Sequence, residues 1–508
     1  MGVGVFSSEL EEDIMSKKVI VIGGGIAGLS AGIYARKSGF DVTILESHSR
    51  AGGNCTSWER GGYLFEGGMH WLSGSGKDED LHKSWRYVGA LDDSVGIQTA
   101  EPFFEYNHMG VPVRAYRNVD AMEKHLIELS PRDEKEIRGL CSNVRKVQNL
   151  AMPVTDILGV KATKKRRMPV SLLFSAMPAF FLMRKFSKIP RDAYIKRFNH
   201  EGIRNMLRSC TEDKTGIVPF FFTMGILARG DGGFPEGGSL PFVERIVRTF
   251  RSLGGELLLG TRADRVVIED GKATGVVAGE RILDADAVIV TTDTMAVGNL
   301  FDALPEADWL GEMRGVCEPS MVTFVSLGIN ADLKNYPQVL TFKIKRPISI
   351  GTQTYEYLSV NNYAADPAYS AEGKTAVTVM LSGDTYDFWI KAREENRYGE
   401  EKQKLADEVE RELAEQMPEI AGKIEVSDVA TPLTYERYCG TWKGSFMTEM
   451  TPSMKMKTYP AVVKGLSGVY FAGHRLMPPG GLPAALMTGR AAVQYLCRDT
   501  GEVFVSEN

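Results

Sequence analysis

The sequence lacks several features that mark other classes of protein. Its 6 cysteines stand alone with no C-x-x-C pair, which disfavours a zinc site or a disulfide framework and fits a reducing cytoplasm. No apolar run approaches the ~20 residues that cross a bilayer. Lys and Arg number 60 against 65 Asp and Glu, so no basic surplus indicates a nucleic-acid partner. We expect a globular cytoplasmic protein without a metal.

Signals that would redirect the chain are also missing. Residues 1–15 carry neither the basic start nor the apolar core of a secretory signal, and we interpret them as a dispensable N-terminal extension. No internal repeat or low-complexity segment occurs. At ~150 residues per domain, a chain of 508 residues is long enough for two or three domains.

Glycine, by contrast, is abundant, and its first cluster follows a short apolar strand. Residues 18–22 are β-branched and apolar, as expected of a strand buried on both faces of a parallel sheet. The motif Gly23-x-Gly25-x-x-Gly28 follows, then a predicted helix over 29–38 and a second strand over 41–45. This order is typical of a dinucleotide-binding β-α-β unit.

Each glycine of this first motif has a task in such a unit. Gly23 permits the tight turn, Gly25 lets a pyrophosphate approach the backbone, and Gly28 lets the helix pack on the strand. Glu46, at the end of the second strand, is placed to accept hydrogen bonds from an adenosine ribose. The alternative is a glycine-rich turn with no ligand. The candidate cofactor contacts here are Gly23, Gly25, Ile26, Ala27, Gly28, Glu46 and Ser47.

A second glycine motif decides between nicotinamide and flavin. Gly52 and Gly53 follow Glu46 in the pattern Glu-x5-Gly-Gly, which resembles the second fingerprint of the FAD-binding amine oxidase and phytoene desaturase superfamily. The resemblance implies that both glycines, with Asn54, lie close to the FAD pyrophosphate and flavin. The family often has Arg where this chain has Asn54.

Two distant segments resemble later parts of the same FAD domain. Residues 234–292 contain a helix and several predicted strands, and the resemblance implies that the backbone near Ala263 holds the adenine. Residues 468–485 resemble the C-terminal flavin motif, followed by a predicted helix over 486–497. The family usually has Asp where this chain has His474, which either contacts the ribityl chain or packs at the strand end. The implied contacts in this third motif are Gly473, His474, Gly480, Gly481 and Leu482.

The resemblance also implies a domain organisation. Residues 430–444 look like the branch of carotenoid desaturases, carotenoid isomerases and retinol saturases. We therefore predict an α/β protein with a Rossmann-type, glutathione-reductase-like FAD-binding domain and an inserted α+β substrate domain. The FAD domain is expected to comprise 16–74, 230–295 and 431–508, and the substrate domain 75–229 and 296–430.

Within the substrate domain, one segment indicates contact with lipid. Residues 164–185 hold 16 apolar-rich residues between two basic clusters, too few to span a bilayer. Such a segment suits an element lying in the membrane interface and drawn to anionic lipids. The alternative is a buried helix or tunnel wall, and both readings lead to a lipophilic substrate.

The resemblance implies an FAD-dependent oxidoreductase acting on carbon–carbon double bonds of a polyene, carotenoid or retinoid-like lipid. Desaturation, saturation and isomerisation remain open, as does the electron donor or acceptor, because no second G-x-G-x-x-G marks an NADPH domain. His70 is the candidate proton-transfer residue, the alternative being a packed histidine. Cys439 is read as a free thiol rather than a flavin attachment. Two other functions stay open: a flavin amine oxidase and a non-catalytic prenyl-lipid escort.

Overall fold

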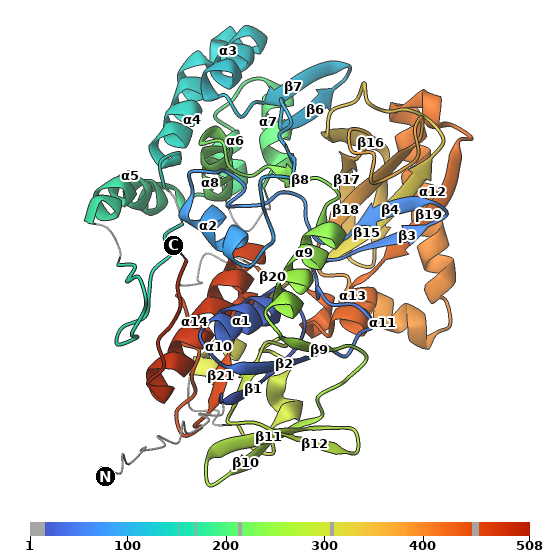
Figure 1. The fold of residues 1–508 in the computed structure, drawn as a ribbon. Coiled ribbons are helices and arrows are strands. Elements are labelled where there is room, and N and C mark those ends of the chain that lie inside the picture. The colour runs from blue at the N-terminus through green and yellow to red at the C-terminus, as the bar shows by residue number, and fades with distance from the viewer. Residues whose placement is uncertain are drawn as a thin grey trace, which may run out of the picture.

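Two β-sheets organise the molecule, a parallel one below and a mainly antiparallel one above (Figure 1). The computed structural model describes residues 16–150, 152–167, 170–211, 216–304, 309–449 and 457–507. The expected N-terminal extension, 1–15, lies outside these residues.

The parallel sheet has five strands in the order β21-β13-β1-β2-β9. They are β1 (Lys18–Ile22), β2 (Asp41–Leu45), β9 (Glu256–Leu258), β13 (Ala287–Val290) and β21 (Val469–Phe471). Alternate β1 residues enter different cores, since Val19 and Val21 pack on one face and Ile20 and Ile22 on the other. Burial on both faces explains the continuous apolar run, and the α/β fold class is confirmed.

Helices cover one face of this sheet (Figure 1). They are α1 (Ile26–Lys37), α9 (Ser239–Ser252) and α14 (Leu482–Thr500), and α1 packs against both others. A Cβ on Gly489 of α14 would lie 2.4 Å from the Ala27 carbonyl oxygen, so the two helices meet at backbone distance. The other face carries the antiparallel sheet β10 (Arg265–Glu269), β11 (Lys272–Ala278) and β12 (Arg281–Asp284), with α10 (Trp309–Val316).

The second sheet has seven strands in the order β19-β15-β18-β17-β16-β6-β7. They are β6 (Phe104–His108), β7 (Val111–Ala115), β15 (Val322–Ile329), β16 (Val339–Ile350), β17 (Gln353–Asn362), β18 (Thr375–Ser382) and β19 (Ile424–Ala430). All neighbours are antiparallel except β6 and β16. Two helices, α11 (Tyr386–Glu394) and α12 (Tyr398–Gln416), share a hydrophobic core with this sheet.

A helical layer with its own core flanks β6 and β7 (Figure 1). Its helices are α3 (Val119–Leu129), α4 (Glu134–Val147), α5 (Val170–Phe186), α6 (Arg191–Ile195), α7 (Glu201–Ser209) and α8 (Val218–Ala228). The remaining elements are α2 (Asp80–Tyr87), α13 (Pro432–Cys439), and the strand pairs β3 (Ser57–Arg60) with β4 (Tyr63–Glu66), β5 (Ile97–Gln98) with β8 (Phe234–Pro235), and β14 (Pro319–Ser320) with β20 (Met447–Thr448).

Some elements differ from the sequence-based expectation. The helix α14 begins at Leu482, four residues before the expected start at 486, because Pro483 is tolerated in a first helical turn. The β3–β4 hairpin lies against the seven-stranded sheet, where the Leu64 amide donates to the Tyr369 carbonyl at 2.9 Å. We retain the division into FAD and substrate domains as a proposal, with this hairpin crossing their boundary.

Candidate active site

The first glycine motif forms a tight turn between β1 and α1. The Gly23 amide donates to the Leu45 carbonyl at 2.8 Å, and a Cβ on Gly28 would lie only 1.9 Å from the Gly23 carbonyl oxygen. Gly25 is the N-cap of α1 without a side-chain hydrogen bond. The first amides of α1, at Ile26 and Ala27, therefore favour an anion through their partial positive charge.

Glu46 holds the end of β2 to this turn. One carboxylate oxygen accepts from the Gly24 amide at 2.7 Å and the other from the His48 amide at 2.7 Å. The Glu46 carbonyl also accepts from the Thr261 amide at 2.8 Å, which brings the strand end close to Ala263. Ser47 is exposed beside it. The expected ribose and adenine contacts are thus gathered in one place.

The second glycine motif touches the first. The Gly52 amide donates to the Gly24 carbonyl at 2.9 Å, and Gly52 has φ +132° with a Cβ position 2.6 Å from the Cys55 carbonyl oxygen. Gly53, at φ +58°, has a Cβ position 3.4 Å from the Gly25 Cα. Asn54 donates weakly to the Ser445 carbonyl at 3.5 Å. Two motifs separated along the chain therefore form one glycine-lined surface.

The third glycine motif approaches from β21. The Gly473 amide donates to the Thr488 hydroxyl of α14 at 3.0 Å. Gly481 is the N-cap of α14 without a side-chain hydrogen bond, and Leu482 is the first helical residue. A Cβ on Gly480 would lie 2.5 Å from His474 Nδ1, so glycine makes room for the imidazole. Burial and the neighbouring Arg475 lower the pKa of His474 to about 4.

A buried ion pair, which sequence reasoning missed, fixes this motif. Arg475 donates to both carboxylate oxygens of Asp293, at 2.7 and 2.8 Å, and the two side chains are 1% and 2% exposed. Asp293 also accepts from the Trp442 amide at 2.9 Å, while Arg475 donates to the Ser445 hydroxyl at 2.6 Å. The pair joins the loop after β13 to the segment 442–448. Its only sequence signal was Arg475 inside the third motif.

A second missed residue, Glu66, organises the segment that carries His70. Its buried carboxylate accepts from Gly68 N, Met69 N, Ser239 N, Ser239 Oγ and Tyr369 Oη. Burial raises the pKa of Glu66, and the hydrogen bonds from Ser239 and the backbone oppose that shift. The residue thereby fixes the turn after β4 to the start of α9.

His70 lies at the end of this turn, against an apolar cluster. Its ring stacks on Phe324 with 5.8 Å between centroids, and burial lowers its pKa to about 4, so the imidazole is neutral at pH 7. Tyr435 donates to the Gly67 carbonyl at 2.8 Å. The cluster comprises Val322, Phe324, Ala430 and Tyr435, with Trp58, Met380, Cys439 and Phe446 packed against it.

Several buried polar atoms along these motifs lack a hydrogen-bond partner among the described residues. They are Asn54 Oδ1, His70 Nδ1, Thr292 Oγ1, Thr441 Oγ1 and His474 Nδ1. Buried polar groups are normally paired, and a glycine surface with two uncapped helix N-termini suits a pyrophosphate. These residues therefore fit FAD. Cys439 has its pKa raised to about 12 by burial, so its thiol stays protonated and is a poor nucleophile.

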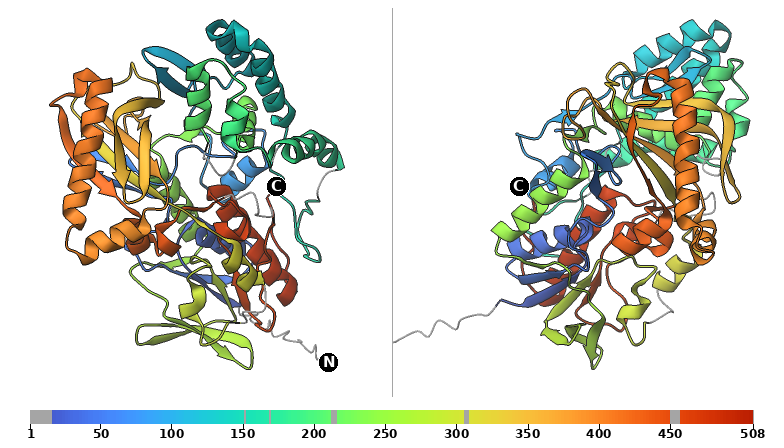
Figure 2. Two further views of the ribbon diagram at one scale, coloured as in Figure 1. Left: turned by 180° about the vertical axis from the view of Figure 1, so that it is seen from behind. Right: turned by 90° about the vertical axis from the view of Figure 1, so that its right-hand side faces the viewer.

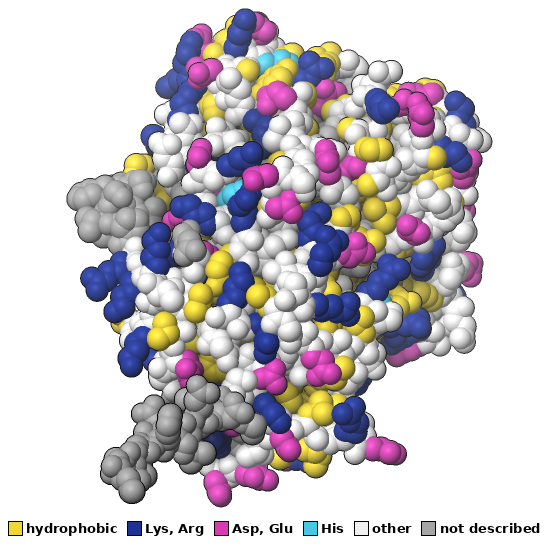
Figure 3. All heavy atoms as spheres, in the orientation of Figure 1, with side chains coloured by type: hydrophobic (Ala, Val, Ile, Leu, Met, Phe, Trp, Pro, Cys, Tyr) yellow, Lys and Arg dark blue, Asp and Glu magenta, His cyan; other side chains and the backbone are white. Residues whose placement is uncertain are grey.

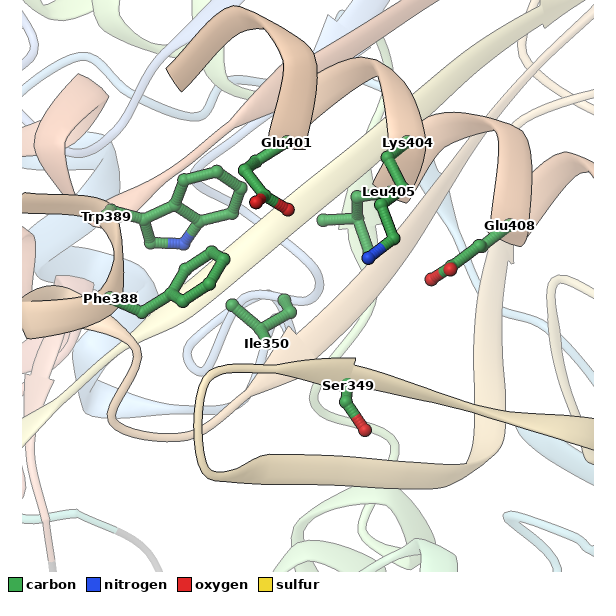
Figure 4. Close-up of a pocket in the computed structure, with 8 residues that line it drawn as sticks. All are labelled: Ser349, Ile350, Phe388, Trp389, Glu401, Lys404, Leu405 and Glu408. Atoms are coloured by element: carbon green, nitrogen blue, oxygen red, sulfur yellow. The ribbon is translucent and has the colours of Figure 1, made fainter. Parts of the chain in front are cut away.

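Two cavities of the described chain lie away from this site. One, of about 10 Å³, has room for about one water molecule and lies between β16, α11 and α12. Figure 4 shows Lys404 there between Glu401 and Glu408. A wider hollow of about 460 Å³ lies beside β6, α7 and α12 and includes Tyr106 and Lys343. Neither is lined by a residue of the three glycine motifs.

The fold and the site define an FAD-dependent oxidoreductase. A family model described as flavin containing amine oxidoreductase matches residues 26–497, and the chain belongs to this family. The sequence-based identification of the superfamily, the cofactor and the enzyme class is thus confirmed, and the reading as a non-catalytic escort is not supported.

Several curated relatives align over almost the whole chain. All-trans-zeta-carotene desaturase of Myxococcus xanthus is 23% identical over 96% of this chain and 94% of its own length. All-trans-retinol 13,14-reductase of Danio rerio is 21% identical over 96% of this chain and 87% of its own length. Among solved structures, an oxidoreductase from Methanosarcina mazei has a TM-score of 0.61 at 20% identity, covering 94% of this chain and 100% of that one.

Proposed function

We propose that this FAD-dependent enzyme acts on carbon–carbon double bonds of a hydrophobic polyene, carotenoid or retinoid-like lipid. The near end-to-end similarity to a carotene desaturase and a retinol reductase carries this proposal. The apolar cluster beside His70 supports it, because apolar and aromatic side chains suit contact with a hydrocarbon substrate.

The three glycine motifs are proposed to hold the cofactor. Gly23, Gly25, Ile26, Ala27 and Gly28 would bind the pyrophosphate, Glu46, Ser47 and Ala263 the adenosine, and Gly52, Gly53, Asn54, Gly473, His474, Gly480, Gly481 and Leu482 the remaining phosphate, ribityl and flavin groups. Bound FAD supplies hydride transfer to or from the substrate. The orphaned Asn54 Oδ1 and His474 Nδ1 would gain partners from such a ligand.

His70 is proposed to transfer a proton to or from the substrate carbon next to the carbon that exchanges the hydride. Its Nδ1 has no partner in the described part of the chain, so a neutral ring can present a donor or an acceptor to a bound molecule. Glu66 positions it by accepting from the Met69 amide at 2.9 Å. The apolar neighbours Phe324 and Tyr435 exclude water from the same region.

Anaerobic flavin spectroscopy with product mass measurement tests the proposal. The protein is photoreduced, or kept oxidised, and mixed with polyenes, retinoids and unsaturated fatty acids in detergent. Reoxidation with a product heavier by two hydrogen atoms identifies a saturase, and bleaching of the oxidised flavin with loss of two hydrogen atoms a desaturase. An unchanged mass with altered retention identifies an isomerase.

An amine panel is the control for the flavin amine oxidase alternative. Flavin bleaching by amines with peroxide formation, and no reaction of any kind with the polyenes, would overturn the proposal. The amine oxidases share the fold at low identity, so the fold alone does not separate the two functions.

A further inference from the structure

The helix α5 packs on the protein with one face and leaves an apolar face in solvent. Ala179, Leu182 and Phe186 are buried in the core shared with α4 and α8. On the opposite side Phe180 and Phe181 are 61% and 57% exposed. Among the residues whose burial is described, they are the only phenylalanines that are exposed, so their exposure is not ordinary surface scatter.

One more apolar side chain lies on this face. Met177, one turn before Phe181, is 49% exposed. The loop before α5 runs down the same edge of the molecule, as Figure 1 and the view from behind in Figure 2 show. We call Met177, Phe180 and Phe181 the apolar edge.

The apolar edge is bordered by positive charge. Residues 157–191 contain no Asp or Glu, although the whole chain carries a net charge of −5. The exposed basic residues of this stretch are Lys161, Lys164, Lys165, Arg167, Arg184, Lys185 and Lys188. Figure 3 shows Lys and Arg side chains gathered along the corresponding left edge. Apolar side chains beside basic ones match the acyl region and the phosphates of an anionic bilayer.

The basic loop is held in place by residues 504–506. The Phe504 amide donates to the Lys161 carbonyl at 2.8 Å, and the Thr163 amide donates to the Phe504 carbonyl at 2.9 Å. The Lys164 amide donates to the Ser506 hydroxyl at 3.1 Å. Because the backbone that carries these lysines is fixed, less conformational entropy is lost when they bind a surface.

The apolar edge is connected to the active site through α8. This helix packs against α5 and ends at Ala228, just before Gly233. The Gly233 carbonyl accepts from the Leu72 amide at 2.9 Å, two residues beyond His70. The apolar edge is thus joined by one packed helix to the segment that carries the candidate proton-transfer residue.

We propose that α5 and the basic loop 161–167 dock this enzyme on the surface of an anionic lipid bilayer. Phe180 and Phe181 enter the interface, and the surrounding Lys and Arg contact lipid phosphates. The helix lies in the interface plane, since no described helix is long and apolar enough to cross a membrane. Docking rests on the proposed function in one respect, because the bilayer would be the source of the lipophilic substrate. The test measures binding to vesicles and requires no turnover.

Vesicle cosedimentation of the FAD-loaded protein tests the docking. Vesicles of neutral phosphatidylcholine are compared with vesicles containing about 30% phosphatidylglycerol. We expect binding to the anionic vesicles that falls by about tenfold or more between about 0.05 and 0.5 M salt. Phe180→Glu with Phe181→Glu, and separately Lys164→Glu with Lys165→Glu, should each lower the binding constant at least about tenfold.

Matched variants separate docking from general changes of the surface. Ile282→Glu removes a 65% exposed apolar side chain of β12, and Lys334→Glu with Lys423→Glu reverses two exposed charges of the substrate domain. Both controls should bind as the wild type does, with flavin absorbance and thermal midpoint unchanged in every variant.

Three results would overturn the docking proposal while leaving the proposed function intact. The first is a wild type that binds neither kind of vesicle. The second is unchanged binding after Phe180→Glu with Phe181→Glu. The third is a concentration-dependent dimer, seen by light scattering, that dissociates in that variant, because the apolar edge would then contact a second copy of the chain.

Discussion

Two histidines of the candidate site are neutral for the same physical reason. His70 and His474 both have pKa values lowered to about 4, with burial as the main cause. In the unfolded chain each would titrate near the ordinary imidazole value of about 6.5. The unfolded state therefore binds more protons than the folded state between about pH 6.5 and pH 4.

Stability should consequently fall as the pH falls through this window. Above about pH 6.5 the rings are neutral in both states and the free energy of unfolding is at its full value. It falls progressively toward pH 4, because the unfolded chain takes up protons that the folded protein does not. We expect the thermal midpoint of the wild type to drop between pH 7 and pH 5 by several degrees more than that of His70→Asn with His474→Asn. Equal drops in differential scanning calorimetry would show that these imidazoles are not held neutral.

At the scale of elements, a buried charge cluster joins α14 to two loops. Arg490 of α14 contacts Glu507 at 3.1 Å and Asp156 at 2.7 Å, and all three side chains are at most 6% exposed. The same Asp156 accepts from the Arg166 amide at 2.6 Å. Removing the cation from such a cluster leaves uncompensated buried carboxylates, which is far more costly than losing a surface pair.

The substitution Arg490→Met should therefore destabilise the protein by about 3 to 5 kcal/mol. Arg498→Met on the same helix, whose partner Asp499 is 40% exposed, should change stability by less than about 1 kcal/mol. Urea unfolding followed by tryptophan fluorescence measures both. Arg490→Met should also speed tryptic cleavage within 161–167, because the loop loses its anchor. Equal behaviour of the two variants would contradict a structural role for the cluster.

At the scale of the whole molecule, the proposed FAD domain is assembled from distant parts of the chain. Its five parallel strands come from residues 18–45, 256–290 and 469–471, and the three glycine motifs meet at their carboxyl ends. A ligand that touches all three motifs binds only the folded assembly. Its binding free energy therefore adds to the stability of the whole fold.

FAD should raise the thermal midpoint, by an amount equivalent to about 4 kcal/mol at a concentration about 1,000 times its dissociation constant. Gly28→Ala should abolish this shift and the absorbance near 450 nm, because its Cβ would lie 1.9 Å from the Gly23 carbonyl oxygen. The control Gly139→Ala sits on α4, where a Cβ meets no atom within 4 Å, and should retain both. Retention of flavin by Gly28→Ala would contradict the proposed role of the first motif.

The parts of the site that depend on local backbone geometry were predictable from the sequence. Gly23 at φ +106° and Gly52 at φ +132° occupy conformations that other residues rarely adopt, so their spacing predicted the turns before any partner was known. The strand β1 was equally evident, because burial on both faces requires an uninterrupted apolar run.

The contacts between groups far apart in the sequence became evident only in the folded protein. Glu66 and Ser239 are 173 residues apart, and Asp293 and Arg475 are 182 apart, so no local pattern signals either contact. The sequence of α5 likewise did not predict which side of the helix is buried, because its apolar residues are distributed around the whole helix. Packing against α4 and α8 buried Leu182 and left Phe180 in solvent. Contacts between distant segments determine which side chains are buried and which groups pair. A short window of sequence contains only the local contribution to that free energy.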